Sequence, residues 1–351
     1  MKFFSYSKLF SCRGESEKVQ YLRIAVSRVS SVKHSTLGFG YLSALLVLLA
    51  WAVAMAGPVY DKPQVTTVLS FNIRYANETD GPNNWENRRY LVRRAIRDHR
   101  PAIFGLQECL WDQGAELTKA FYGYRVTGVG RDDGVRAGEM CLIFTRHDRY
   151  HLLDQGFFWL SETPETPGSK GWDAVCPRIV TWVKLRDRWC NPDTLFVFNT
   201  HFDHVGEAAR AEGARLLKER MALIAEDHAV ILMGDFNDSA NLESPAYRTL
   251  VEESEGTGPT LRDTWSFASE KNQLKGEGTF HGFNGQDDGR RIDWILASDD
   301  FQGIAAGIER FEKKGQYPSD HFPVWDNFFQ QRHPPAPGDE IDSSTGATPR
   351  Y

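Results

Sequence analysis

Residues 230–238, Val-Ile-Leu-Met-Gly-Asp-Phe-Asn-Asp, are the stretch around which the rest of the chain is organised. Its apolar, β-branched first half predicts a buried strand that breaks off at a glycine. In extended backbone, side chains two residues apart point to the same side, so Asp235 and Asn237 can face one site. A carboxylate beside an amide suits proton transfer from water and stabilisation of an oxyanion. An Asx turn that closes the strand explains the same residues on local grounds.

The composition bounds the class of protein. Of 351 residues, 41% are hydrophobic and 13% aromatic, which excludes a mostly disordered chain. The formal net charge of −6 is unevenly spread, because residues 1–38 hold seven basic and two acidic side chains and the remaining residues together carry −11. An acidic body does not indicate nucleic acid as a partner, although a local basic groove would still bind it.

An uncharged segment, residues 37–56, follows the basic residues and ends in Ala54-Met55-Ala56. Together these features predict that residues 1–56 are a basic n-region plus a hydrophobic signal peptide or signal anchor. Either interpretation places the body outside the cytoplasm, as a secreted, periplasmic or membrane-anchored protein. Membrane contact is expected only through this segment, if it is not cleaved. A buried soluble helix is the third interpretation, and the step in charge disfavours it.

The five cysteines form no dense framework and no CxxC motif. Neither a structural zinc site nor a disulfide scaffold is therefore indicated. Cys176 and Cys190 flank one predicted strand and are a candidate pair, which their spacing does not decide.

Hydrophobic periodicity predicts one domain of mixed α and β structure over residues 65–330, after a linker at 57–64. Strands are expected over 65–72, 102–108, 140–145, 156–160, 178–185, 195–200, 230–238 and 291–297 and from residue 322, and helices over 86–99, 113–122 and 207–227. From about residue 331, Pro, Gly, Ser and Thr predominate, which predicts a disordered tail over 331–351.

Polar residues of a restricted set lie at the ends of the predicted strands. They are Asn72, Glu108, His201, Asp235, Asn237 and Asp293, and a loop adds Asp320 and His321. Strand ends on one edge of a sheet converge, so we expect one shared site. Mg²⁺ prefers a few oxygen ligands and keeps waters for substrate, so Glu108 with Asn72 is a sensible minimal metal site.

Zinc is the alternative metal, since His201-Phe-Asp-His204 is the one suggestive zinc-ligand spacing. On a strand these two histidines would face opposite sides, so magnesium is favoured. His201 and His321 would then be free for phosphate contact and proton transfer, with Asp293 or Asp320 orienting an imidazole.

Six motifs occur in order along residues 65–330: Ser-Phe-Asn72-Ile-Arg, Gly-Leu-Gln-Glu108, Asn-Thr-His201, Gly-Asp235-Phe-Asn237, Arg-Ile-Asp293-Trp-Ile and Ser-Asp320-His321. This order resembles the endonuclease/exonuclease/phosphatase superfamily, which has the deoxyribonuclease I-like fold. The resemblance implies a four-layer α/β sandwich, in which two mixed β-sheets pack face to face with helices outside. It also implies Mg²⁺-dependent hydrolysis of phosphoester bonds by in-line attack of water, with Mn²⁺ as a second candidate ion.

The resemblance implies a role for each motif residue. Glu108 would be the principal metal ligand, with Asn72 beside it. Asp235 would orient or deprotonate the water, and Asn237 would stabilise the oxyanion. His201 would contact the scissile phosphate.

The C-terminal motifs would complete the site. Asp293 and Asp320 would support the histidines and the metal, and His321 would bind phosphate or share proton transfer with Asp320. Arg74 stands where relatives acting on abasic DNA carry an acidic residue, so that activity is not expected.

Several loop residues resemble a poorly characterised bacterial-type branch of the superfamily. Among them we predict that Arg131, Trp172, Arg178 and His281 help to line the substrate cleft. For each of them, a solvated loop charge or an aromatic at the rim is the alternative.

The leading hypothesis is thus an exported, metal-dependent phosphoester hydrolase. It is either a phosphodiesterase or a phosphatase, and a nuclease is a further candidate. Its rivals are an extracytoplasmic binding protein on the same fold that has lost catalysis, and a zinc hydrolase that uses His201 and His204. The sequence leaves open the substrate, the number of metals, the general base and the oligomeric state.

Overall fold

The computed structural model describes residues 65–189, 194–252, 259–268 and 276–330, which all belong to one unit of the chain, Tyr60–Tyr351. The predicted signal segment, linker and tail lie outside these residues and stay predictions. The pairing of Cys176 with Cys190 also stays a prediction, because Cys190 is not among them. Within the described ranges, no helix is long and apolar enough to cross a membrane.

Twelve strands form two sheets of six, and each sheet has a parallel pair at its centre. The first sheet has the order β11 (Phe301–Ile308), β12 (Val324–Gln330), β1 (Thr66–Asn72), β2 (Ile103–Cys109), β4 (Met140–Arg146) and β3 (Tyr124–Thr127). The second has the order β5 (Tyr150–Trp159), β6 (Ile179–Asp187), β7 (Thr194–His201), β8 (Ala229–Asp235), β10 (Asp293–Ser298) and β9 (Leu261–Asp263). Strands β1 and β2 run parallel, as do β7 and β8, whereas the other neighbours run antiparallel.

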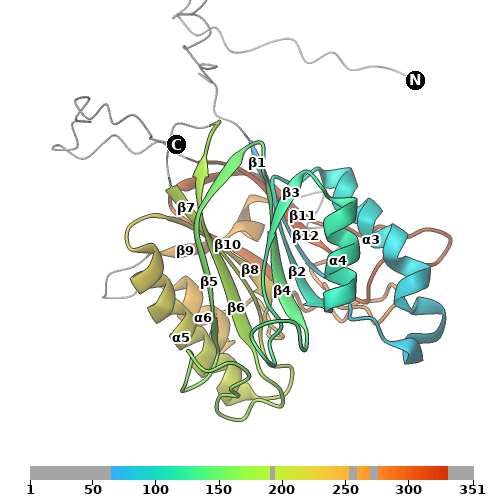
Figure 1. Cartoon of the computed structure of the whole chain (residues 1–351), viewed down its shortest axis with the longest axis horizontal. Coiled ribbons are helices and arrows are strands. Elements are labelled where there is room, and N and C mark those ends of the chain that lie inside the picture. Colours follow the sequence, from blue (N-terminus) through green and yellow to red (C-terminus); the bar gives the residue numbers. More distant parts are fainter. Residues whose placement is uncertain (1–64, 190–193, 253–258, 269–275, 331–351) are drawn as a thin grey trace, which may run out of the picture. The chain divides into compact units, whose positions relative to one another are not determined.

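Helices cover the outer face of each sheet, and the two inner faces pack together (Figure 1). The helices are α3 (Trp85–His99), α4 (Trp111–Ala120), α5 (Glu207–Ala225) and α6 (Pro245–Val251), with short 3₁₀ turns η1 (Glu78–Asn83) and η2 (Thr264–Phe267). One apolar cluster joins α3 and α4 to the first sheet, a second joins α5 and α6 to the second sheet, and a third fills the space between the sheets. These four layers confirm the predicted α/β sandwich.

Helix α3 shows why the sequence periodicity was informative. Its apolar face buries Leu91, Val92, Ala95 and Ile96 at the predicted spacing. The helix begins after Asn84, whose side chain accepts a hydrogen bond from the Asn87 N–H. It ends before Arg100, which adopts the left-handed conformation, and Pro101 prevents continuation.

Some element boundaries differ from the predictions. The strand expected over 230–238 ends at Asp235, because the chain turns and Asn237 has a φ of 50°. Strands β3 and β11 were not predicted, since β3 has four residues and β11 is rich in Gly and Ala. Strand β5 begins at Tyr150, six residues before the expected start.

A buried amide connects the two sheets. Asn199 on β7 donates through Nδ2 to the carbonyl oxygens of Leu106 at 3.0 Å and Leu142 at 2.8 Å, which belong to the opposite sheet. Its Oδ1 accepts a hydrogen bond of 2.6 Å from Gln107 Nε2. A fully satisfied polar group in an apolar layer favours one alignment of the sheets over others.

A second buried polar contact lies on β12. Thr264 Oγ1 is 2.7 Å from the carbonyl oxygen of Ile295 and 2.6 Å from Asp326 Oδ2. A carbonyl only accepts, so the hydroxyl gives its one proton to Ile295 and the contact with Asp326 requires a protonated carboxyl as donor. Burial raises the pKa of Asp326 to about 8, which agrees with this assignment.

Candidate active site

Both sheets contribute to one cleft of about 510 Å³. Its lining includes most of the predicted site residues, together with others that had not been singled out as site residues. The lining residues are Arg74, Tyr75, Glu108, Arg131, Glu139, Cys176, Arg178, His201, His204, Asp235, Asn237, Phe280, Arg290, Ile292, Asp320 and His321. Asn72 and Glu108 come from the ends of β1 and β2, and His201, Asp235 and Asp293 come from β7, β8 and β10. The predicted convergence therefore takes place across two sheets rather than along one.

The amide of Asn72 joins two carboxylates. Its Nδ2 donates to Glu108 Oε1 at 3.0 Å and to Asp235 Oδ2 at 2.8 Å. Its Oδ1 accepts a hydrogen bond from the Arg74 N–H at 3.0 Å. Since the donor end of the amide faces the carboxylates, Asn72 holds Glu108 and Asp235 in place and does not present its oxygen beside Glu108.

Glu108 occupies a special backbone position. Its φ is 57°, and the pairing of β2 with β4 is irregular between Leu106 and Cys109. This conformation turns the Glu108 carboxylate to the cleft, where Oε2 accepts a hydrogen bond from the Tyr75 N–H at 3.1 Å. One acidic side chain is thus presented to the cleft on a backbone that most residues avoid.

Asp235 and Asn237 come together through a turn. The Asn237 N–H donates to Asp235 Oδ1 at 2.9 Å, which is the Asx turn that the sequence also allowed. Asn237 Nδ2 donates to the Phe202 carbonyl at 3.1 Å and lies 3.0 Å from His201 Nε2. The two side chains therefore face one site, but the left-handed turn places them there and not an extended strand.

Burial and the neighbouring Asp293 carboxylate raise the pKa of Asp235 to about 7. Asp235 is 1% exposed, so water does not screen this repulsion. A carboxylate that titrates near neutral pH is suited to accept a proton from water.

Two of the three histidines that line the cleft, His321 and His201, have opposite protonation. His321 Nδ1 donates to Asp293 Oδ2 at 2.9 Å, and His321 Nε2 lies 3.7 Å from Asp235 Oδ2. Burial alone would lower the pKa of His321, but the carboxylates of Asp293 and Asp235 raise it well above its usual value. Burial and the nearby charges of Arg178 and Arg131 instead lower the pKa of His201 well below its usual value.

The hydrogen bonds of His201 fix its tautomer. Asn237 Nδ2 is a donor to the Phe202 carbonyl, so its second hydrogen points to His201 Nε2, which must accept. The proton of neutral His201 is therefore on Nδ1, which lies 3.7 Å from Glu139 Oε2. Glu139 is a functional candidate that the sequence analysis missed, because no motif surrounds it.

Asp320 lies in a loop beside Glu108 and Arg74. The guanidinium of Arg74 is 3.9 Å from both Asp320 Oδ2 and Glu108 Oε2, and it forms two hydrogen bonds of 3.1 Å to Asp80. Burial raises the pKa of Asp320, and the Glu108 carboxylate adds to this effect. Neither Arg74 nor Asp80 was predicted as a site residue.

Two of the four predicted cleft residues do not line the cleft. The ring of His281 is buried and stacks on Phe322 at 4.0 Å, while its backbone N–H donates to the Asp320 carbonyl at 2.8 Å. His281 thus supports the loop that carries Asp320. The indole of Trp172 is not among the lining side chains, and the Trp172 N–H donates to the Glu162 carboxylate.

Arg131 and Arg178 do line the cleft, as predicted from the motifs. Arg131 donates to both oxygens of Glu139, at 2.7 and 2.9 Å. Arg178 donates through Nε to Asp203 at 3.3 Å, and its Nη2 lies 2.9 Å from His204 Nδ1.

The donor set fits a hard divalent cation near Glu108. Glu108, Asp235 and Asp320 offer only carboxylate oxygens, and the Arg74 guanidinium lies 3.9 Å from both Glu108 and Asp320. Oxygen ligands are those that Mg²⁺ and Mn²⁺ prefer. Burial is the main cause of the raised pKa values of Asp235 and Asp320, and the neighbouring carboxylates of Asp293 and Glu108, respectively, add to it.

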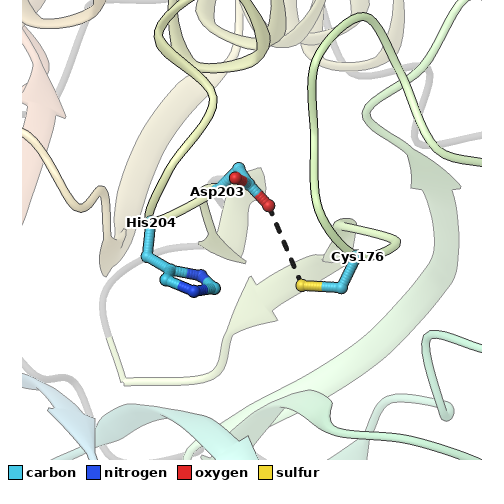
Figure 2. A group of neighbouring side chains, drawn as sticks. All are labelled: Cys176, Asp203 and His204. Carbon is cyan, nitrogen blue, oxygen red and sulfur yellow. Dashed lines mark hydrogen bonds between the residues drawn. The ribbon is translucent and has the colours of Figure 1, made fainter.

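The zinc alternative does not fit. In the described part of the chain, the side-chain groups close enough to share an ion are Asp235, Asp293 and His321, and separately Cys176, Asp203 and His204. His201 and His204 therefore do not belong to a common group. Cys176, Asp203 and His204 do gather closely (Figure 2), but the Arg178 guanidinium contacts both Asp203 and His204 and would repel a cation there.

The fold and the site define a class of protein: phosphoester hydrolases built as an α/β sandwich with carboxylates and two histidines at one edge of both sheets. The chain belongs to the endonuclease/exonuclease/phosphatase family, whose family model matches residues 69–321. This membership and the sandwich confirm the resemblance that the six motifs indicated.

Solved structures of bacterial proteins are similar over most of the chain. An endonuclease/exonuclease/phosphatase of Bacteroides vulgatus is 35% identical, covers 76% of this chain and all of its own, and superposes with a TM-score of 0.69. A mannosyl-6-phosphatase of Bacteroides thetaiotaomicron is 34% identical over 75% of this chain and 99% of its own, with a TM-score of 0.65.

Two further similarities are weaker, one in sequence identity and one in the length that it covers. The catalytic domain of human Nocturnin is 19% identical with a TM-score of 0.61, which shows a common fold. An uncharacterized protein of Acanthamoeba polyphaga mimivirus is 31% identical over 169 residues, which are 45% of this chain and 61% of that protein. The chain thus matches less than two thirds of the length of this curated relative.

Proposed function

We propose that the protein hydrolyses phosphoester bonds with the help of a divalent cation, Mg²⁺ in the first place and Mn²⁺ as the second candidate. One observation carries the proposal: the Asn72 amide joins Glu108 and Asp235, and the His321–Asp293 pair contacts the same Asp235. A cation-binding carboxylate, a base and an imidazolium are therefore held side by side.

Asp235 is the proposed base. A water molecule attacks phosphorus, its oxygen forms the new bond to phosphorus, and its proton passes to the Asp235 carboxylate. The bond from phosphorus to the leaving oxygen breaks, and that oxygen takes up a proton from solvent. The pKa of Asp235, raised to about 7, lets the carboxylate accept this proton near neutral pH.

His321 is the proposed donor to the phosphoryl oxygens. His321 keeps its proton because Asp293 accepts a hydrogen bond from Nδ1, so Nε2–H is left to donate. Asn237 already uses both amide hydrogens on Phe202 and His201, so its part is to hold His201 in place. A preorganised donor such as His321 Nε2–H stabilises charge that develops in the transition state.

Glu108 would hold the cation, with Asp320 nearby. When bound, the cation would supply Lewis-acid stabilisation of negative charge on the phosphoryl and leaving oxygens. Asn72 would keep Glu108 in place through its hydrogen bond to Oε1.

The test is hydrolysis by the full chain with defined metals. We expect p-nitrophenyl phosphate or bis-p-nitrophenyl phosphate to be cleaved with Mg²⁺ or Mn²⁺, not with EDTA, and not by His321→Ala. Failure of the wild-type chain to cleave either compound, or any phosphorylated sugar, with any of these metals would overturn the proposal. Activity with Zn²⁺ alone would overturn the choice of cation.

The substrate class and the location are further parts of the proposal. The mannosyl-6-phosphatase relative supports including sugar phosphates among the compounds tested. The basic segment followed by the uncharged residues 37–56 supports export to an extracytoplasmic location. Fractionation of cells that express the full chain tests the location, and a cytoplasmic protein would contradict it.

A further inference from the structure

Three basic side chains line the cleft beside His201, and we call Arg131, Arg178 and His204 its basic end. We call the carboxylates Glu108, Asp235 and Asp320 its acidic end. Arg131, Arg178 and His201 also line a narrow recess together with Glu108. Groups at this basic end are thus close to the place where His201 would meet the scissile phosphate.

Among the described cleft residues, three buried nitrogens have no hydrogen-bond partner: Arg131 Nε, Arg178 Nη1 and His201 Nδ1. In the part of the chain that the structure describes, Arg178 Nη1 is the one buried arginine Nη nitrogen that makes no hydrogen bond. Arg178 is only 3% exposed. By contrast, both Nη atoms of Arg131 are bound to Glu139, and Arg290 is exposed and paired with Asp288. A buried guanidinium N–H without a partner indicates an acceptor that arrives with a ligand.

Asp203 fixes the direction of Arg178 Nη1. Its Oδ2 accepts from Arg178 Nε, and its Oδ1 accepts from the N–H groups of Val205 and Gly206 at 3.0 and 2.8 Å, just before α5. Figure 2 shows Asp203 with Cys176 and His204, and Cys176 Sγ lies 3.8 Å from Asp203 Oδ2. The guanidinium is therefore anchored on a carboxylate that is itself held by backbone.

His204 supplies a second donor. Arginine has no acceptor atom, so the contact of 2.9 Å between Arg178 Nη2 and His204 Nδ1 requires Nδ1 to accept. The proton of neutral His204 is then on Nε2. Because His204 lines the cleft, Nε2–H and Arg178 Nη1–H are two donors held by one another at the same end.

We propose that Arg178 and His204 form an anion subsite that makes the enzyme prefer phosphomonoesters over phosphodiesters. The proposal rests on the function proposed above. A phosphomonoester has three terminal oxygens and, above about pH 6, up to two negative charges. A diester has one charge and carries an ester group in place of the third terminal oxygen, so it leaves one of the two donors without its acceptor.

The experiment compares two esters with the same leaving group, p-nitrophenyl phosphate and methyl p-nitrophenyl phosphate. Arg178→Met in the full chain is expected to lower kcat/KM for the monoester by about 10²-fold, the usual effect of removing one donor to a phosphoryl oxygen, and for the diester by less than about fivefold. Arg290→Met is the matched control, because Arg290 also lines the cleft. It is expected to leave the ratio of the two kcat/KM values unchanged.

Arg178→Lys covers the case in which Arg178→Met fails to fold because Asp203 is left unpaired. Lysine keeps the charge and loses the guanidinium fork, so we expect a folded protein with a lowered monoester preference and weaker inhibition by inorganic phosphate. Equal losses on both esters, or an unchanged ratio in both variants, would overturn the subsite. Cleavage of neither ester by the wild-type chain would overturn the proposed function instead.

Discussion

The two ends of the cleft use charge differently. At the acidic end, the neutral amide of Asn72 holds Glu108 and Asp235 without adding positive charge, while burial and the Asp293 carboxylate raise the pKa of Asp235. At the basic end, each arginine is paired with a carboxylate, Arg131 with Glu139 and Arg178 with Asp203. The acidic end therefore offers net charge to a cation, whereas the basic end offers directed N–H groups with little net charge.

The largest effect is expected at the acidic end. Glu108→Gln removes the charge that would hold the cation, so kcat/KM should fall by about 10³-fold or more on every phosphoester. Steady-state kinetics over a range of Mg²⁺ concentrations measures both the loss and the metal affinity. A variant that keeps more than a tenth of the activity at unchanged Mg²⁺ affinity would show that Glu108 does not bind the cation.

The next largest effect on activity is expected at the ion pair of His321 with Asp293. Asp293→Asn removes the main carboxylate that keeps His321 protonated, and we expect kcat to fall by about 10²- to 10⁴-fold at neutral pH. Asp288→Asn, at an exposed carboxylate, is the control and should keep full activity. Equal activity of the two variants would exclude a role for the His321 proton.

Glu139→Gln tests whether the basic end acts through its net positive charge or through the orientation of its N–H donors. If the end acted through net positive charge, loss of the Glu139 carboxylate would improve the use of anionic substrates. We expect the opposite, a fall in kcat by about tenfold with little change in KM, because the Arg131 guanidinium loses the carboxylate that orients it. A rise in kcat/KM would reverse our account of this end.

The smallest effect on activity is expected outside the cleft, at Asp326. Its pKa is about 8 in the folded chain and about 4 in an unfolded one, so folding retains a proton. This contribution to stability is fully present below about pH 4 and is lost as the pH rises through about 8. Asp326→Asn should leave kcat within about twofold and should reduce the fall in melting temperature between pH 5 and pH 8.

A wild-type melting temperature that rises between pH 5 and pH 8, or an identical pH dependence in Asp326→Asn, would contradict the assignment of the proton. Thermal unfolding followed by circular dichroism at both pH values makes this measurement.

The sequence located the acidic end well because its residues stand at the ends of recognisable strands. Glu108, Asp235 and Asp293 each follow or begin a run whose apolar pattern predicts a strand. The partners at the basic end were not found, since Glu139 and Asp203 lie in loops and their roles depend on side-chain contacts that no strand or helix pattern specifies. Local patterns carry no information on such pairings.

The absence of tertiary contacts from local sequence patterns also explains where the predicted positions of site residues differ from the structure. His281 was expected to line the cleft, but packing against Phe322 buries its ring. Asn237 was expected to face the site through the alternation of a strand, whereas a φ of 50° places it there. Asn72 was predicted beside the metal from the preference of Mg²⁺ for oxygen ligands and from the resemblance, and the direction of its amide could not be known before its partners were.

The buried amide of Asn199 determines which parts of the protein tolerate substitution. Asn199 is two residues before His201, and Leu106, which accepts its hydrogen bond, is two residues before Glu108. One side chain therefore aligns the half of the cleft that belongs to each sheet. Loops around the rim can vary and alter specificity while the halves stay aligned, whereas a substitution at Asn199 can disable the enzyme with every residue of the cleft intact.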